Sequence, residues 1–246
     1  MKLARVAIAA LLAGAGTAGA SVGWNAFDSA WRYARTEAQG PFKVADRLAQ
    51  FGDRAKARLA PHFMAADVPF PPEAVTLLAF KDARRAELYA RGGGKPWTFV
   101  RAYPLLAASG GLGPKLRQGD EQVPEGIYRV TFLNPNSRFH VSLRLDYPND
   151  FDLRMARADR RVGLGGDIMI HGNDRSSGCL AMGDAAAEEL FTLAALVTPS
   201  QVKVIISPTD FRTSAFGMTP ASGATWVPDL YRAIEAELAQ YRNLRL

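Results

Sequence analysis

The sequence predicts a domain of the mostly β or α+β class that carries helical segments at both of its ends. Between residues 75 and 207, strand-length segments with alternating or continuous apolar residues outnumber the helical ones. Amphipathic helical periodicity marks residues 44–63 and 226–244 instead. Many strands with few helices between them favour a sheet core decorated by helices over a doubly wound parallel sheet.

Residues 1–20 have the composition of a secretory signal peptide. Lys2 and Arg5 give a positive start, a short apolar run follows, and the small residues from Ala18 to Ala20 match a cleavage site. The apolar run is shorter than the roughly 20 residues that a bilayer span requires. We therefore expect export with cleavage after Ala20, and retention of the segment as an anchor is the alternative.

Residues 21–72 are predicted to form a helical extension packed on the main domain. Helical periodicity is present at 29–38 and at 44–63. The proline-rich stretch 68–72 closes this region, because proline cannot continue a helix.

The predicted main domain covers residues 73–212, and residues 213–246 are predicted to form a C-terminal helical extension. Residues 92–95 predict a hairpin turn, and residues 109–126 predict a long loop because glycines and prolines interrupt them repeatedly. A helix is expected at 185–197. The strands are expected at 75–81, 86–92, 98–108, 127–133, 139–150, 168–170 and 201–207.

The formal net charge of +6 is moderate, and the basic residues are spread along the chain. The sequence has no basic tail, repeated basic stripe or nucleic-acid-binding motif, so we expect no nucleic-acid partner. The densest basic cluster is interrupted by aspartates and is interpreted as a solvated surface loop. Its members are Arg154, Arg157, Arg160 and Arg161.

Cys179 is the single cysteine of the chain, and His171 precedes it by eight residues. An unpaired thiol close to a histidine that can deprotonate it indicates a nucleophile and its base. Residues 168–170 predict a buried strand that delivers His171 to a loop, where Gly172 permits close backbone approach. Because a predicted helix follows Cys179, we expect the thiol near a helix N-terminus, where free N–H groups and the helix dipole favour the thiolate.

Other interpretations of these residues compete with a catalytic pair. Cys179 can be a buried, inert residue. A zinc site requires three or four ligands, and one cysteine with one histidine falls short. No recognised metal pattern emerges even if Asp174, Asp184 or His140 is added, so we expect neither a metal nor a cofactor. A papain-type protease has its cysteine before its histidine in the chain. His62 is expected at a surface helix end.

A series of motifs resembles the YkuD-fold L,D-transpeptidases, and most closely their YafK-like branch. The motifs lie in the family's order and together span about residues 75–210. They are GLGPKLRQGD at 111–120, VPEGIYRV at 123–130, FHVSLRLDYPND at 139–150, IMIHGN at 168–173 and SSGCLAMGD at 176–184. This series is far more specific than a His-Gly pair and a Gly-Cys pair alone.

The resemblance implies a β-rich catalytic domain, export to the periplasm, and a cysteine nucleophile that acts on peptidoglycan stem peptides. On that resemblance, Cys179 is the nucleophile and His171 accepts and donates the proton. The backbone N–H groups of Gly178 and Cys179 would form the oxyanion hole. The residues implied to line the substrate cleft are His140, Tyr147, Asn149 and Ser177, although a packing role suits Tyr147 equally well.

The sequence departs from the broader family at two positions near the cysteine. Ser177 stands where a histidine is usual, and Ala181 stands where an arginine is usual. The stretch between the catalytic pair is also shorter. All three features are typical of the YafK-like branch.

The family's chemistry is acyl transfer through a thioester, and several outcomes stay open. A stem-peptide amine as acceptor would crosslink the cell wall, and a lysine of an anchored lipoprotein would be attached to it. Water as acceptor would make the enzyme a hydrolase that detaches lipoprotein or cuts crosslinks. A non-catalytic peptidoglycan-binding module is the alternative of another class. A redox protein would need a resolving cysteine, which this chain lacks.

Overall fold

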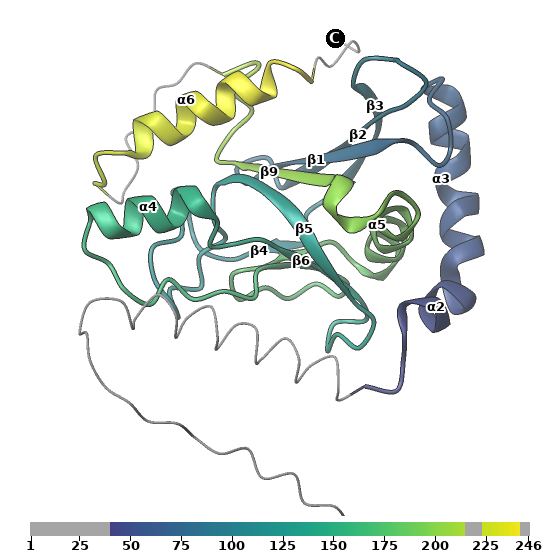
Figure 1. Ribbon diagram of the computed structural model, residues 1–246, viewed down its shortest axis with the longest axis horizontal. Helices are drawn as coiled ribbons and strands as arrows, with labels where there is room; N and C mark the ends of the chain where they lie inside the picture. Colours follow the sequence, from purple (N-terminus) through teal and green to yellow (C-terminus); the bar gives the residue numbers. More distant parts are fainter. Residues whose placement is uncertain (1–39, 215–222, 242–246) are drawn as a thin grey trace, which may run out of the picture.

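The computed structural model of the protein describes residues 40–214 and 223–241 (Figure 1). The predicted signal segment 1–20 and the predicted helix at 29–38 lie outside the described residues. Within the described part, no helix is long and apolar enough to cross a membrane.

The described residues contain one mixed sheet with the strand order β3-β2-β1-β9-β5-β6-β7-β8-β4. Its strands are β1 (Ala74–Phe80), β2 (Arg85–Arg91), β3 (Thr98–Pro104), β4 (Ala107–Ala108), β5 (Gly126–Asn134), β6 (Ser142–Leu145), β7 (Met169–His171), β8 (Leu180–Ala181) and β9 (Val202–Ser207). Two neighbouring pairs, β1 with β9 and β7 with β8, are parallel. The other pairs are antiparallel.

The sheet is curled. Only Leu105 and Leu106 separate β3 from β4, yet these strands lie at opposite ends of the strand order. Nine strands at about 4.8 Å spacing would place the two edges of a flat sheet almost 40 Å apart. A link of two residues spans roughly 10 Å. The two edge strands must therefore approach each other, and the predicted strand 98–108 is in fact two strands at opposite edges.

Helices cover both faces of the sheet, because apolar side chains of β1 point alternately to one face and to the other. Val75 and Leu77 pack into one apolar core, and Leu78 and Phe80 pack into a second core on the other face. The first core also takes side chains from α3 (Asp53–Ala65) and α5 (Asp184–Val197). The second takes side chains from α6 (Val227–Leu238) and the partly buried Phe151 and Met155 of α4 (Asp150–Ala158) (Figure 1). The predicted sheet core decorated by helices is confirmed.

The helices at 44–63 and 185–197 are confirmed with small shifts of their ends. The first begins as α2 (Val44–Arg47), continues through a π-helical segment (Leu48–Gly52), and ends with α3. The turn at 92–95 is also confirmed, with Gly93 and Gly94 at φ +62° and +74°. A short 3₁₀ helix (Pro199–Gln201) precedes β9.

The interpretation of the arginine cluster as a surface loop was wrong for its first half, because Arg154 and Arg157 lie on α4. Asn149 caps this helix: its side-chain oxygen accepts the N–H groups of Phe151 and Asp152. The predicted strand 139–150 was consequently too long. It shortens to β6, and its last residues belong to the helix cap.

Candidate active site

Cys179 lies between Gly178 and the first residue of β8, and it is partly exposed. Its place differs from the expected helix N-terminus, because β8 and Gly183 separate it from α5, which begins at Asp184. The field of a helix dipole falls off within the first turn of the helix. The dipole of α5 is therefore too remote to favour the thiolate.

His171 ends β7, which runs parallel to β8 with Ile170 opposite Leu180 and His171 opposite Ala181. Continuing this register by one residue places Met169 beside Cys179, and the Met169 N–H indeed interacts with the Cys179 sulfur. Side chains two residues apart on neighbouring strands share a face of the sheet. The pairing of two very short strands thus brings the predicted nucleophile and base to the same face.

The imidazole of His171 is buried and held in one orientation. Its Nδ1 lies 2.6 Å from the carbonyl oxygen of Gly172. Its ring stacks on Phe139 with 4.6 Å between centroids. A carbonyl oxygen can only accept, so Nδ1 carries the proton and Nε2 keeps a lone pair. Burial lowers the pKa of His171 below its ordinary value, which keeps the ring neutral near pH 7.

The loop after His171 passes close to Asp184 and to the backbone of Phe139, and Gly172 makes this approach possible. A β-carbon on Gly172 would lie 2.4 Å from Asp184 Oδ1 and 2.9 Å from the carbonyl oxygen of Phe139. Asp184 Oδ1 accepts the N–H of Asn173 at 2.8 Å. Only glycine fits there, so the predicted close backbone approach at Gly172 is confirmed.

The thiol of Cys179 is protonated in the resting site. Burial is the largest cause that raises its pKa, and the nearby Asp167 carboxylate raises it further. The Met169 N–H and the charge of Lys115 act in the opposite direction. The sulfur points at the carbonyl oxygen of Asp167, 3.6 Å away. Both shifts favour the neutral forms, a protonated thiol and an uncharged imidazole, near pH 7.

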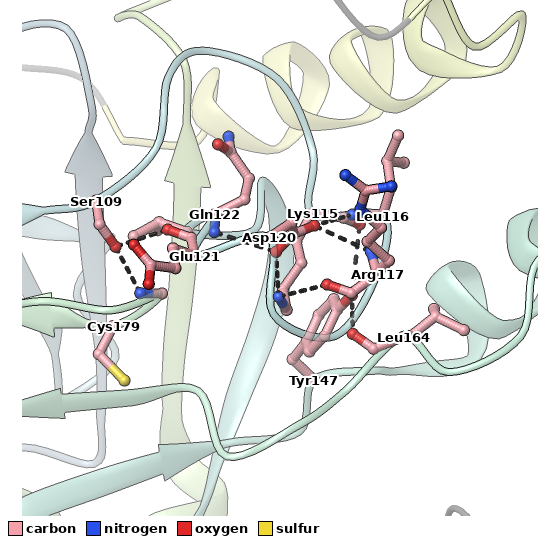
Figure 2. Close-up of polar contacts among 12 residues, drawn as sticks. Ser109, Lys115, Leu116, Arg117, Asp120, Glu121, Gln122, Tyr147, Leu164 and Cys179 are labelled. Carbon is pink, nitrogen blue, oxygen red and sulfur yellow. Dashed lines mark hydrogen bonds and ion pairs between the residues drawn. The ribbon is translucent and has the colours of Figure 1, made fainter.

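Two serine hydroxyls hold the backbone of the turn that carries Cys179. Ser109 Oγ accepts the Gly178 N–H at 2.5 Å. Ser176 Oγ accepts the Cys179 N–H at 3.2 Å and donates to the Cys179 carbonyl oxygen at 2.6 Å. The two N–H groups assigned by resemblance to an oxyanion hole are therefore already hydrogen-bonded in the resting site. Figure 2 shows Ser109 reaching the turn of Cys179 from a facing loop.

The loop of residues 109–122, which carries Ser109, is held by hydrogen bonds between its own side chains and its backbone. Asp120 forms an ion pair with Lys115 and accepts the N–H groups of Leu116, Arg117 and Gln122 (Figure 2). Although partial burial acts in the other direction, these hydrogen bonds lower the pKa of Asp120 below its ordinary value. A charged Asp120 thus organises the GLGPKLRQGD motif.

A buried ion pair attaches this loop to the sheet. Lys81, which follows β1, lies 3.0 Å from Glu125 and donates to the carbonyl oxygen of Gly113 at 3.1 Å. Glu125 accepts the N–H of Gly113 at 2.7 Å and the hydroxyl of Tyr231 on α6 at 2.7 Å. The loop position is therefore coupled to both the central strand and the C-terminal helix.

The other residues expected to line the cleft have different surroundings. His140 has φ +73° and its Nε2 lies 3.1 Å from Glu188 on α5. Tyr147 is buried, and its hydroxyl donates weakly to the Lys115 carbonyl oxygen at 3.4 Å. Asn149 caps α4. Ser177 is exposed directly before Gly178. Of the four, only Ser177 is part of the turn that carries the cysteine.

Sequence reasoning missed Ser109, Ser176 and Asp167. Ser176 lies within a quoted motif, three residues before the cysteine, where a hydroxyl commonly accepts a nearby backbone N–H. Ser109 stands 69 residues from Gly178, so no local pattern could have paired them. In the described residues, no group of three or more histidine, cysteine, aspartate or glutamate side chains is arranged to hold a metal ion.

Comparison with known proteins identifies the family. The family model of YkuD, described as the L,D-transpeptidase catalytic domain, matches residues 75–206, which is more than half of the chain. The chain belongs to this family. The match contains both strands that carry the pair, and the loop of residues 109–122.

One similar protein is YafK of Escherichia coli K12, which is provisionally named an L,D-transpeptidase. It is 38% identical over 120 residues, which are 48% of this chain and 46% of YafK. The same values hold for YafK of strain O157:H7. The match therefore spans about half the length of these relatives.

Solved structures of low identity are also similar. The helical cell shape determining protein Pgp2 of Campylobacter jejuni is 23% identical over 55% of this chain and 48% of its own, with a TM-score of 0.44. L,D-transpeptidase 1 of Mycobacterium tuberculosis is 15% identical over 55% of this chain and 62% of its own, with a TM-score of 0.32. Family membership rests on the family model, not on these structures.

Proposed function

We propose that the protein is a periplasmic cysteine acyltransferase of the L,D-transpeptidase type that acts on peptidoglycan tetrapeptide stems. The observation that carries this proposal is the pairing of β7 with β8, which brings the single thiol and the neutral imidazole of His171 to one face of the sheet. The family match supports the reaction type, and the predicted signal segment supports the compartment.

In the first step His171 acts as general base. Nε2 takes the proton of the Cys179 thiol while the sulfur attacks the carbonyl carbon of the bond that precedes the terminal D-alanine. The resulting tetrahedral oxyanion meets the N–H groups of Gly178 and Cys179. Because serine hydroxyls already accept both N–H groups, the substrate oxygen enters as an additional acceptor.

Collapse of the oxyanion breaks the carbon–nitrogen bond, and the imidazolium gives its proton to the departing amine. D-alanine leaves, and a thioester on Cys179 remains. In the second step an amine or a water molecule attacks the thioester, His171 takes a proton from it, and the sulfur leaves as thiolate. That thiolate then recovers a proton from the imidazolium, so the protonated thiol and neutral imidazole of the resting site return.

Mass spectrometry of the intact protein after exposure to a tetrapeptide muropeptide tests the proposal. We expect an adduct on Cys179 with the mass of the donor minus D-alanine, and none in the Cys179→Ala variant. A carbapenem, which acylates thiols without a departing amine, provides a longer-lived probe. An unmodified Cys179 with both reagents would contradict the proposal.

The same incubation distinguishes the fates of the acyl group. Crosslinked dimers indicate transfer to the amine of a second stem peptide, and lipoprotein-linked muropeptides, formed when an anchored lipoprotein is also present, indicate transfer to its lysine. Monomers that only lose D-alanine indicate hydrolysis. A Cys179→Ala variant that binds peptidoglycan and retains the full effect on cell-wall composition would instead support a non-catalytic binding module.

A further inference from the structure

Ser109 joins three segments that are distant in the sequence. Its hydroxyl accepts the Gly178 N–H at 2.5 Å, donates to the Glu121 carbonyl oxygen at 2.7 Å, and lies 3.0 Å from Ser176 Oγ. Its own N–H donates to Ser176 Oγ at 3.1 Å. One side chain therefore links the two ends of the loop of residues 109–122 to the turn that carries the nucleophile (Figure 2).

The turn depends on this link because of Gly178. Gly178 is buried at φ +97°, and a glycine has no side chain that packing could hold. The peptide unit before it can rotate unless its N–H has a fixed acceptor. Ser109 supplies that acceptor, and its hydroxyl is itself oriented by the Glu121 carbonyl oxygen.

We propose that Ser109 is a positioning residue for acyl transfer: its hydroxyl holds the peptide unit before Gly178 so that the Gly178 N–H and the Cys179 sulfur keep the relative orientation that carbonyl addition needs. The inference rests on the proposed function and extends it to a residue outside the cysteine motif. Displacement of reacting groups by about 1 Å costs on the order of 100-fold in rate, so a single anchoring hydrogen bond can matter.

Two reactions of the Cys179 sulfur distinguish an effect on the orientation of the backbone donors from an effect on the access of reagents to the thiol. Acylation by a carbapenem passes through a tetrahedral oxyanion, so it depends on the orientation of the backbone donors. Alkylation by iodoacetamide forms a carbon–sulfur bond, breaks the carbon–iodine bond and releases iodide, so it forms no oxyanion. Loss of the Ser109 hydroxyl should therefore slow the first reaction and leave the second nearly unchanged.

The experiment measures both rate constants in wild type, Ser109→Ala, Ser109→Thr and the matched control Ser207→Ala. Ser207 is a buried serine on β9 whose hydroxyl also donates to a backbone carbonyl oxygen, that of Thr209, at 2.6 Å. We expect Ser109→Ala to lower acylation by about tenfold or more, with alkylation within about twofold. Ser109→Thr should retain most of the acylation, and Ser207→Ala all of it.

Several outcomes overturn the inference. Acylation of Ser109→Ala at the wild-type rate or faster would show that the hydroxyl does not position the turn. Equal loss of acylation and alkylation would show that it acts only on access to the thiol. If Ser109→Ala fails to fold, Ser176→Ala must show the same split between the reactions. No acylation of the wild-type protein would overturn the proposed function itself, and the inference with it.

Discussion

The two halves of the curled sheet are built in different ways. In the long-strand half, formed by β3, β2, β1, β9 and β5, strands of six to nine residues pair in long registers. In the short-strand half, formed by β6, β7, β8 and β4, the strands have two to four residues. Long ladders and buried apolar side chains support the first half, so it needs few special contacts.

The short-strand half relies on side chains that bind backbone groups. Ser109 and Ser176 hold the Cys179 turn, Asp184 holds the loop after His171, and Asp120 holds the facing loop. Four of the eight described non-glycine residues with positive φ lie in this half. Glu121, His140, Asp167 and Asn173 have φ between +51° and +73°. Such conformations cost free energy and persist only where surrounding contacts impose them. Regular structure provides stability in one half, and irregular structure shapes the site in the other.

The largest effect should come from changing the base in the short-strand half. We expect His171→Gln to lower the carbapenem acylation rate by about 10² to 10⁴-fold, because glutamine cannot take the thiol proton. The rate is expressed per folded molecule, because the ring is buried and stacked on Phe139 and its replacement should also lower the melting temperature. Intact-mass kinetics measure the rate, with Cys179→Ala as the control that forms no adduct. A rate within threefold of wild type would refute the role of the imidazole.

A core substitution in the long-strand half should affect stability instead. Leu77 is buried on β1, and Leu77→Ala should lower the free energy of unfolding by about 2–5 kcal/mol through lost burial and a cavity. Urea denaturation measures this loss. Acylation per folded molecule should stay at the wild-type value. Met64, which is 79% exposed, provides the control: Met64→Ala should leave both quantities unchanged. A large loss of acylation in Leu77→Ala would show that the halves are not separable.

Two glycines with similar backbone conformations give a matched pair across the halves. Gly178 has φ +97° and Gly94 has φ +74°, and neither has an atom within 3.4 Å of an added β-carbon. Each substitution by alanine should therefore cost about 1–2 kcal/mol in backbone strain. Only Gly178→Ala should also slow acylation. Unfolding and acylation assays on both variants check this, and slowing by Gly94→Ala would contradict it.

The last prediction concerns pH, and it separates the stability of the fold from the activity of the site. Burial raises the pKa of Asp152 on α4 to about 7. The folded protein therefore holds a proton that the unfolded chain releases near pH 4. The stabilisation is complete below that value and is lost as the pH rises through 7. Asp152→Asn should weaken the decline in unfolding free energy between pH 5 and pH 8.

Acylation should respond to pH in the opposite direction. Because the pKa of His171 is lowered, the acylation rate should increase with pH below 6.5, as the imidazole becomes neutral. This rise should be the same in Asp152→Asn as in wild type. A shifted acylation profile in that variant would mean that Asp152 acts on the site, which the contacts of α4 do not suggest.

Apolar patterns predicted the long-strand half well and the short-strand half poorly. Residues 75–81 and 201–207 are mostly apolar, and their strands β1 and β9 are neighbours with side chains buried on both faces. Residues 98–108 and 139–150 also look like single strands, but each is divided. Residues 98–108 are divided because the chain passes from one sheet edge to the other. Residues 139–150 are divided because Asn149 caps α4. Neither feature changes the apolar periodicity of the sequence.

The proposed catalytic pair shows which information the local sequence contains. A single cysteine shortly after a His-Gly pair is visible in the chain, and so are the identities of both groups. Their ionisation is not. It depends on burial, on the Gly172 carbonyl oxygen and on Asp167. These factors favour a neutral thiol and a neutral ring, whereas the sequence led us to expect a thiolate at a helix terminus.

Composition, periodicity and motif order were thus sufficient for the fold class and the family, and for proposing Cys179 and His171 as the reactive side chains, because these properties follow from residue types and short spacings. The proton positions, the contact between Ser109 and Gly178, and the meeting of the two sheet edges required the folded chain. They depend on distances between residues that are tens of positions apart, and the burial that shifts a pKa exists only after those residues have come together.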